Sequence, residues 1–139
     1  MNRKQKLIAA AALAAVAATW AIPAQAGRTL NAVKSRGMVV CGVNTAAPGF
    51  SGADSRGHWK GLDVDICRAV AAAVLKDANK VKFVPLSSEQ RFTALQSGQI
   101  DILARNTTWS MSRDASQGSV FVAMDYLDGQ GFMVPKKYK

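Results

Sequence analysis

One segment of the chain combines side chains that bind anions. Arg113 follows a run of amide and hydroxyl residues: Asn106, Thr107, Thr108 and Ser110. A guanidinium group binds a carboxylate through two parallel hydrogen bonds, and backbone N–H groups at a helix start attract the same anion. The spacing therefore indicates a receptor for a carboxylate. It is also typical of a capped helix start whose arginine is solvated or paired with Asp114.

The other reactive residue types do not form a catalytic or metal-binding set. His58, the sole histidine, lies in a glycine-rich stretch with no visible acid or nucleophile partner, so we expect a solvated loop residue. Asp63 and Asp65 stand two positions apart at a helix start and do not face each other, so helix capping and the helix dipole account for them. We expect no catalytic residue, no metal and no cofactor.

The first 26 residues have the features of a cleavable secretory signal peptide. A basic start is followed by an uncharged apolar run from Leu7 to Ile22 and by the cleavage site Ala24-Gln25-Ala26. The run is about 16 residues long, short of the roughly 20 that span a bilayer. We predict a periplasmic protein without a stable membrane anchor. In an exported chain, the pair Cys41 and Cys67 favours a disulfide over a metal site.

The formal net charge of +9 does not indicate a nucleic-acid partner. Much of the excess lies at the two ends, because residues 28–134 contain 12 basic and 9 acidic side chains. Aromatic residues do not alternate with these cations as a groove for single strands requires. We expect no nucleic-acid binding.

The elements that position these residues alternate between strands and helices. Apolar runs predict strands at 38–43, 81–85, 100–104 and 129–134. Helical spacing predicts helices at 27–36, 63–76 and 88–97, the second with Ile66, Val70, Ala73 and Val74 on its buried stripe. This order predicts an α/β fold with a mostly parallel sheet flanked by helices. The loops after the strands should then converge at one sheet edge, where ligands bind.

Several motifs carry a resemblance to a known family. They are Cys41-Gly-Val-Asn, Gly61-Leu-Asp-Val-Asp-Ile, Phe83-Val-Pro, the segment 91–101, Asn106-Thr-Thr-Trp through Arg113, and Asp128-Gly-Gln-Gly-Phe-Met-Val. In order and spacing the chain resembles the amino-acid-binding periplasmic proteins of ABC importers, solute-binding protein family 3. The resemblance is greatest to the general L-amino-acid-binding subgroup, in which Asn-Thr-Thr-Trp and the two cysteines look characteristic.

The resemblance implies a role for each site residue. Arg113 matches the arginine that binds the ligand α-carboxylate, Thr108 a residue that assists it, and Asn106 an acceptor for the α-amino group. Asn44 and Ser88 match positions that line the pocket.

Two further positions bear on ligand preference. Phe50 matches an aromatic residue that packs beneath the loop rather than contacting ligand. Ala47 stands where many relatives carry a ring over the ligand side chain, which leaves the side-chain preference open.

The resemblance also implies an architecture and partners. Residues 27–139 are expected to form the first lobe of a periplasmic-binding-protein-like fold, with the second lobe missing. The expected function is the substrate-binding component of an amino-acid importer, or a fragment of it, and not an enzyme. L-amino acids and membrane permease subunits are the expected partners. The alternatives are a periplasmic enzyme of the same fold, such as a cyclohexadienyl-type dehydratase, and a nonfunctional truncated fragment.

Overall fold

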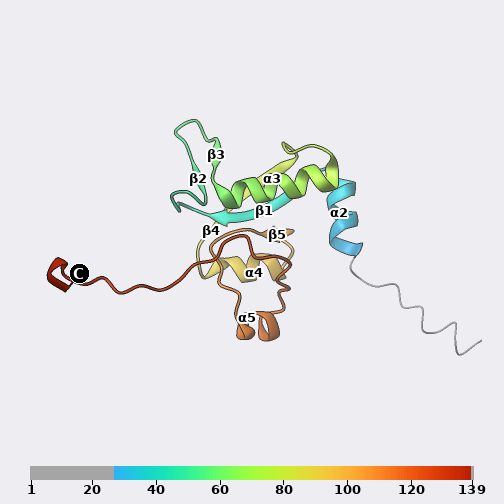
Figure 1. Cartoon of the computed structure of the whole chain (residues 1–139). Coiled ribbons are helices and arrows are strands. Elements are labelled where there is room, and N and C mark those ends of the chain that lie inside the picture. The colour runs from blue at the N-terminus through green and yellow to red at the C-terminus, as the bar shows by residue number, and fades with distance from the viewer. Residues whose placement is uncertain (1–26, 139) are drawn as a thin grey trace, which may run out of the picture. The chain divides into compact units, whose positions relative to one another are not determined.

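A computed structural model describes residues 27–138 (Figure 1). The expected signal peptide, residues 1–26, lies outside the described residues. The chain divides into two units, the first ending at Arg36 and the second beginning at Gly37. The first unit contains α2 (Arg28–Arg36), a helix that agrees with the prediction and is followed by Gly37 at φ +71°.

The second unit is built on a parallel sheet of three strands. These are β1 (Val39–Asn44), β4 (Val81–Leu86) and β5 (Ile102–Leu103), in the order β4-β1-β5. β1 pairs with β4 along its whole length, and Cys41 and Gly42 also pair with β5. The predicted parallel α/β fold is therefore confirmed, and the second unit forms one lobe of it.

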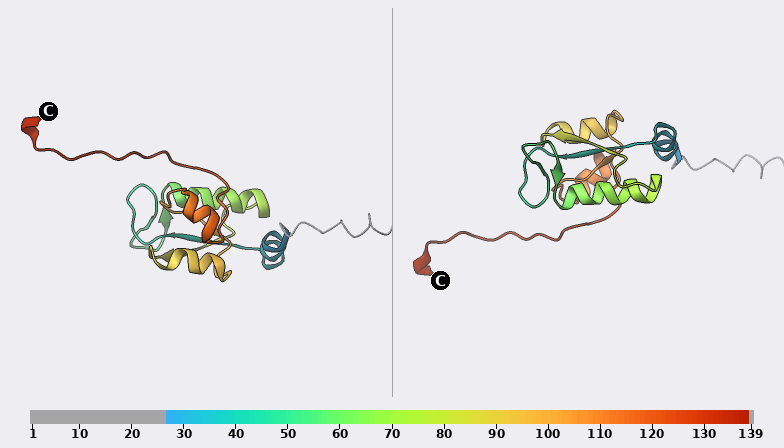
Figure 2. Two further views of the ribbon diagram at one scale, coloured as in Figure 1. Left: turned by 90° about the horizontal axis from the view of Figure 1, so that it is seen from below. Right: turned by 90° about the horizontal axis from the view of Figure 1, so that it is seen from above.

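Helices cover both faces of this sheet (Figure 2). α3 (Leu62–Leu75) lies on one face and α4 (Gln90–Gln96) on the other. Cys41 and Val43 of β1 pack with Cys67 on the α3 side. On the other side, Leu86, Ala94 and Ile100 form a second cluster. Because β1 is buried on both faces, its sequence is continuously apolar rather than alternating.

The buried face of α3 differs from the predicted stripe. Val64, Cys67 and Ala71 are each 0% exposed, whereas Ala73 is exposed and Ile66 only partly buried. Alanines occupy much of this helix, so its hydrophobic pattern does not distinguish one face clearly. The disulfide between Cys41 and Cys67, which was predicted, joins the helix to β1 on the face that is buried.

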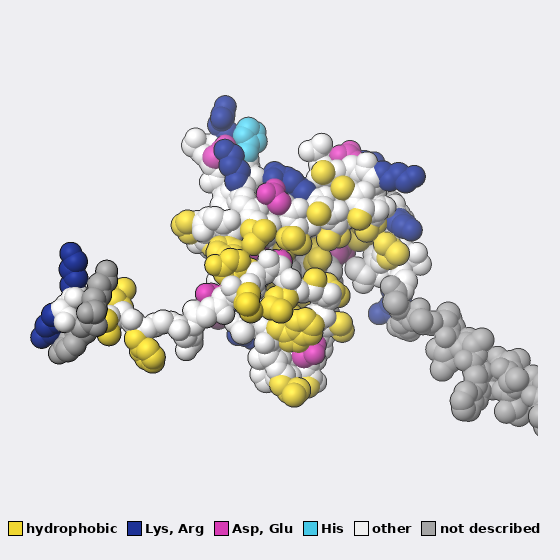
Figure 3. Space-filling model, in the orientation of Figure 1, with side chains coloured by type: hydrophobic (Ala, Val, Ile, Leu, Met, Phe, Trp, Pro, Cys, Tyr) yellow, Lys and Arg dark blue, Asp and Glu magenta, His cyan; other side chains and the backbone are white. Residues whose placement is uncertain are grey.

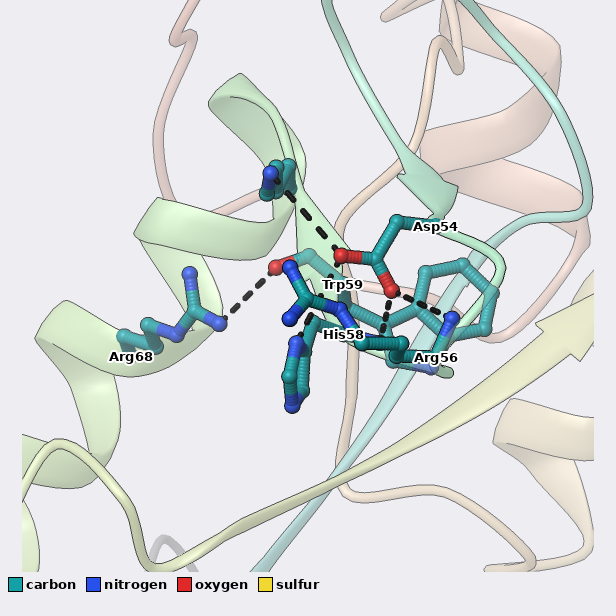
Figure 4. Close-up of polar contacts among 6 residues, drawn as sticks. Asp54, Arg56, His58, Trp59 and Arg68 are labelled. Atoms are coloured by element: carbon teal, nitrogen blue, oxygen red, sulfur yellow. Dashed lines mark hydrogen bonds and ion pairs between the residues drawn. The ribbon is translucent and has the colours of Figure 1, made fainter.

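A small hairpin interrupts the long loop predicted after the first strand. Its strands are β2 (Gly52–Ala53) and β3 (Trp59–Lys60), which pair antiparallel. The Asp54 carboxylate accepts the backbone N–H groups of Arg56 and His58, both at 2.9 Å, and this fixes the turn (Figure 4). The hairpin is tied to α3 because Arg68 Nη2 donates to the Trp59 carbonyl oxygen at 2.9 Å.

The expectation that His58 lacks an acidic partner was wrong. Its Nδ1 lies 3.4 Å from Asp54 Oδ2. The backbone hydrogen bond from His58 is the main cause that holds the pKa of Asp54 below its usual value. The His58 side chain is 67% exposed, and the basic tip of the hairpin stands out at the surface (Figure 3).

The predicted strand at 129–134 is absent from the structure. After α5 (Met111–Ser116), residues 119–135 have no regular secondary structure, and a short 3-10 turn, η2 (Lys136–Tyr138), follows. Phe132 and Met133 are 98% and 101% exposed. A strand needs a neighbour for its hydrogen bonds, and none of the described residues supplies one. Within residues 27–138, no helix is long and apolar enough to cross a membrane.

Candidate functional site

The predicted site residues lie at or beyond the carboxyl ends of the three parallel strands, and Arg113 lies in α5, the helix after β5. Asn44 is the last residue of β1, and its Nδ2 donates to Oδ1 of Asn106, beyond β5, at 2.9 Å. The two asparagines are separated by 62 positions in the sequence, and the side-by-side pairing of β1 and β5 brings them together. Both side chains are accessible, with Asn106 exposed and Asn44 half-buried.

Ser88 lies at the same edge, after β4, the strand on the other side of β1 from β5. It is exposed in the turn after β4, and its Oγ lies 3.4 Å from Nη2 of Arg105. The helix that follows begins at Gln90, where Ser87 and Gln90 each accept the backbone N–H of the other at 3.3 Å. This reciprocal pairing satisfies N–H groups that a helix start leaves open.

Arg113 lies in α5 and is half-buried, and its guanidinium is held by the loop that precedes this helix. Nη1 donates to the Thr108 carbonyl oxygen at 2.7 Å, and the group lies 5.9 Å from the centre of the Phe92 ring. Asp114 is engaged elsewhere, since it accepts a hydrogen bond from Trp109 Nε1 at 3.4 Å. Arg113 is therefore not paired with Asp114, which was one of the arrangements that the sequence allowed.

Two more arginines, which were not predicted to belong to the site, lie at the same edge. Arg91 and Arg105 are each only 9% exposed, and the Nε of each is buried without a hydrogen-bond partner. Arg91 Nη1 donates to Thr107 Oγ1 at 3.2 Å, and Arg105 Nη1 donates to the Leu86 carbonyl oxygen at 3.0 Å. The sequence carries no clear signal of this burial, because Arg105 stands two positions beyond a strand that is only partly buried.

Asp63 is a buried carboxylate close enough to Arg105 to interact with its charge. The predicted capping role is wrong, because Gly61 occupies the N-cap of α3 and no side chain caps it. Asp63 is 2% exposed, and its Oδ2 has no hydrogen-bond partner. Burial raises the pKa of Asp63 to about 6; the charge of Asp125 adds to this, and that of Arg105 opposes it.

Aromatic pairs connect this edge to the chain beyond α5. Phe50 packs edge-on against Tyr126 with ring centres 5.0 Å apart, and Trp109 stacks on Phe121 at 5.2 Å. Ala47 is half-buried in a tight turn, where its backbone N–H donates to the Ser51 carbonyl oxygen at 2.8 Å. Within the described part of the chain, no group of three or more His, Cys, Asp or Glu residues is arranged to hold a metal ion.

Comparison with known proteins identifies the family. The sequence profile of the bacterial extracellular solute-binding proteins, family 3, matches residues 39–139. The chain belongs to this family. The general L-amino acid-binding periplasmic protein AapJ of Rhizobium johnstonii is 54% identical over 133 residues, which cover 96% of this chain and 39% of AapJ. The chain thus spans about two fifths of that relative's length.

Two solved structures are similar in fold. A periplasmic binding protein of an ABC transporter from Brucella ovis, with glutathione bound, is 54% identical and has a TM-score of 0.69, covering 70% of this chain and 30% of that one. The arginine-bound form of domain 1 of TmArgBP, from T. maritima, is 25% identical with a TM-score of 0.53. The similarity to it covers 60% of this chain and 64% of that domain.

Proposed function

We propose that this chain is the substrate-binding component of an ATP-driven amino-acid importer, or the lobe of one that receives the ligand. It binds the α-carboxylate of an L-amino acid in the periplasm and delivers it to membrane permease subunits. The observation that carries the proposal is Arg113, whose guanidinium is accessible and held by Thr108 in the loop that also holds Asn106.

The ligand is bound by groups from three loops. Arg113 binds the carboxylate, with the Thr108 hydroxyl beside it, and the oxygen of Asn106 accepts from the α-amino group. Asn44 and Ser88 line the remainder of the pocket. The bound glutathione of the Brucella protein supports a ligand with a free amino-acid end, and the arginine-bound domain 1 supports binding by a single lobe.

A single lobe encloses the ligand on one side only. At 4 Å, an ion pair contributes about 1 kcal/mol in water and about 4 kcal/mol at the effective dielectric of a protein surface. Water therefore weakens the contact between Arg113 and the ligand carboxylate. We expect the affinity of residues 27–139 to be lower than that of a two-lobed relative by several kcal/mol.

The proposal excludes catalysis as the function. An enzyme such as a dehydratase needs an acid or base that contacts its substrate. Asp63 has the raised pKa typical of such a group, but its side chain is 2% exposed and enclosed within the lobe. The relatives are solute-binding proteins by description, which supports binding without chemistry.

Ligand-dependent thermal stability tests this function. Residues 27–139 are heated with each common L-amino acid and with glutathione at millimolar concentration. A ligand at one hundred times its dissociation constant stabilises the folded form by about 2.7 kcal/mol, which raises the melting temperature. Arg113→Ala should abolish the rise, whereas Arg56→Ala, at the exposed hairpin tip, should preserve it. A melting temperature that no amino acid raises, or an Arg113→Ala variant that still responds, contradicts the proposal.

A further inference from the structure

Arg105 reaches across the carboxyl end of the central strand. It follows β5 by two positions, and its Nη1 and Nη2 contact the Leu86 carbonyl oxygen and Ser88 Oγ, at 3.0 and 3.4 Å, at the end of β4. β1 lies between these two strands. At the usual strand spacing the outer strands are about 10 Å apart, so one extended side chain bridges them.

The charge of Arg105 is balanced inside the lobe. Burial lowers the pKa of Arg105, while the charges of Asp63, from α3, and Glu89, before α4, oppose this. Arg91 is the neighbouring cation, and Arg105 lowers its pKa. Arg105 is therefore buried with a carboxylate nearby, and its Nη groups are directed at Leu86 and Ser88 of the protein itself. Arg113, by contrast, is more exposed, and its guanidinium donates to the Thr108 carbonyl oxygen.

A hydrogen bond from Arg91 also holds the loop 105–108. From α4, Arg91 donates to the Thr107 hydroxyl at 3.2 Å, between the predicted ligand residues Asn106 and Thr108. The loop 105–108 is therefore held from β4 by one buried guanidinium and from α4 by another. Both guanidinium groups retain a buried Nε without a partner, so their positions are determined by the Nη contacts.

We propose that Arg105 is a positioning residue of the ligand site. It holds the turn that carries Ser88 at a set distance from residues 106–108, so that polar groups of the two loops face one amino-acid ligand. Arg105 itself does not contact the ligand. This inference rests on the proposed function and names the residue that assembles its site.

A double-mutant cycle on ligand affinity tests the role. Arg105→Lys keeps the positive charge but cannot donate to Leu86 and Ser88 at once as the guanidinium does. Ser88→Ala removes the hydroxyl that Arg105 contacts. With L-glutamate as the probe in titration calorimetry, each change should weaken binding by about tenfold. The double variant should lose less affinity than the sum of the two single losses, because the two side chains contact each other. Additive losses, or an Arg105→Lys variant with unchanged affinity, overturn the proposal.

A ligand-free measurement separates this inference from the proposed function. In Arg105→Lys, amide hydrogen exchange should become faster in residues 86–90 and 105–108 and stay unchanged in the hairpin 52–60. The matched variant Arg113→Lys should leave residues 86–90 unchanged. Unaltered exchange at 86–90 in Arg105→Lys overturns the positioning role, whether or not L-glutamate binds. A wild-type chain that binds no amino acid, with the expected exchange pattern, overturns only the proposed function.

Discussion

Three arginines at the carboxyl ends of the strands differ in burial, and this difference separates their roles. Arg91 and Arg105 are 9% exposed and donate to groups of the lobe itself, whereas Arg113 is half-buried. A buried guanidinium without partners is costly, so the internal contacts of the first two are needed for folding. Arg113 keeps a surface that an incoming carboxylate can reach.

Asp63 gives the stability of the lobe a specific dependence on pH. Its pKa is about 6 in the folded protein against 3.8 for an ordinary aspartate, so the ionised form opposes folding. Ionised Asp63 therefore lowers the free energy of unfolding above pH 6. The loss disappears as the pH falls toward 4, because the folded state binds the proton more tightly than the unfolded state. Two pKa units correspond to about 3 kcal/mol. At neutral pH, Asp63→Asn should therefore raise the free energy of unfolding by about 2 kcal/mol.

Urea unfolding at pH 4.5 and pH 7.5 checks this expectation. The advantage of Asp63→Asn over wild type should shrink as the pH is lowered. Asp54 and Glu89, whose pKa values are lowered, are present in both proteins, so their contribution cancels in the difference between Asp63→Asn and wild type. Asp65→Asn is the matched control, because its exposed ion pair with Arg68 contributes at most about 1 kcal/mol. An Asp63→Asn variant less stable than wild type at pH 7.5 would show that the carboxylate is needed.

At the scale of elements, the start of α3 depends on one glycine. Gly61 has φ +123°, and a Cβ there would lie 2.3 Å from the Phe50 carbonyl oxygen. Gly61→Ala should therefore cost about 3 kcal/mol or more, because both the dihedral angle and the backbone contact forbid a side chain. Gly57→Ala, in the hairpin turn, should cost about 1 kcal/mol, since its φ is +81° and no atom lies within 4 Å. Equal losses in urea unfolding would contradict this.

The disulfide joins the same helix to the centre of the sheet. Cys41 of β1 and Cys67 of α3 are both 0% exposed and separated by 26 positions. A cross-link that closes a loop of this length lowers the conformational entropy of the unfolded chain. In that model it stabilises the fold by about 3 to 4 kcal/mol. It also holds the start of α3, and with it Asp63, against the sheet that carries the site.

At the scale of the whole molecule, the segment after Tyr126 contributes little to the folded lobe. Leu127, Phe132 and Met133 are 83%, 98% and 101% exposed. Side chains that stay in water gain nothing from folding. Removal of residues 127–139 should change the free energy of unfolding by less than about 0.5 kcal/mol, as measured by urea unfolding.

A longer deletion is the control for this prediction. Removal of residues 120–139 also takes away Phe121 and Tyr126, which pack on Trp109 and Phe50. Each aromatic pair contributes about 1 kcal/mol beyond the area it buries, so this variant should be measurably less stable. A shorter deletion that destabilises the lobe as much as the longer one would mean that residues 127–139 do pack against it.

The sequence by itself predicted the alternating strands and helices between residues 28 and 104, the parallel sheet and the disulfide, but not the hairpin β2–β3. Periodicity and apolar runs are local properties, and alternating strands and helices leave little choice of topology. The motif order also predicted the family. Asn106 and Thr108 lie in the loop after β5 and Arg113 in α5, and their binding roles stay predictions.

Only the tertiary structure decided which charges are buried and which segment pairs. Asp63, Arg91 and Arg105 are enclosed by residues far away in the sequence, and no local pattern distinguishes them from solvated charges. Residues 129–134 have a strand-like composition but no neighbouring strand among the described residues. Burial and strand pairing depend on what the rest of the chain places alongside, because hydrogen bonds and desolvation are satisfied in space rather than along the sequence.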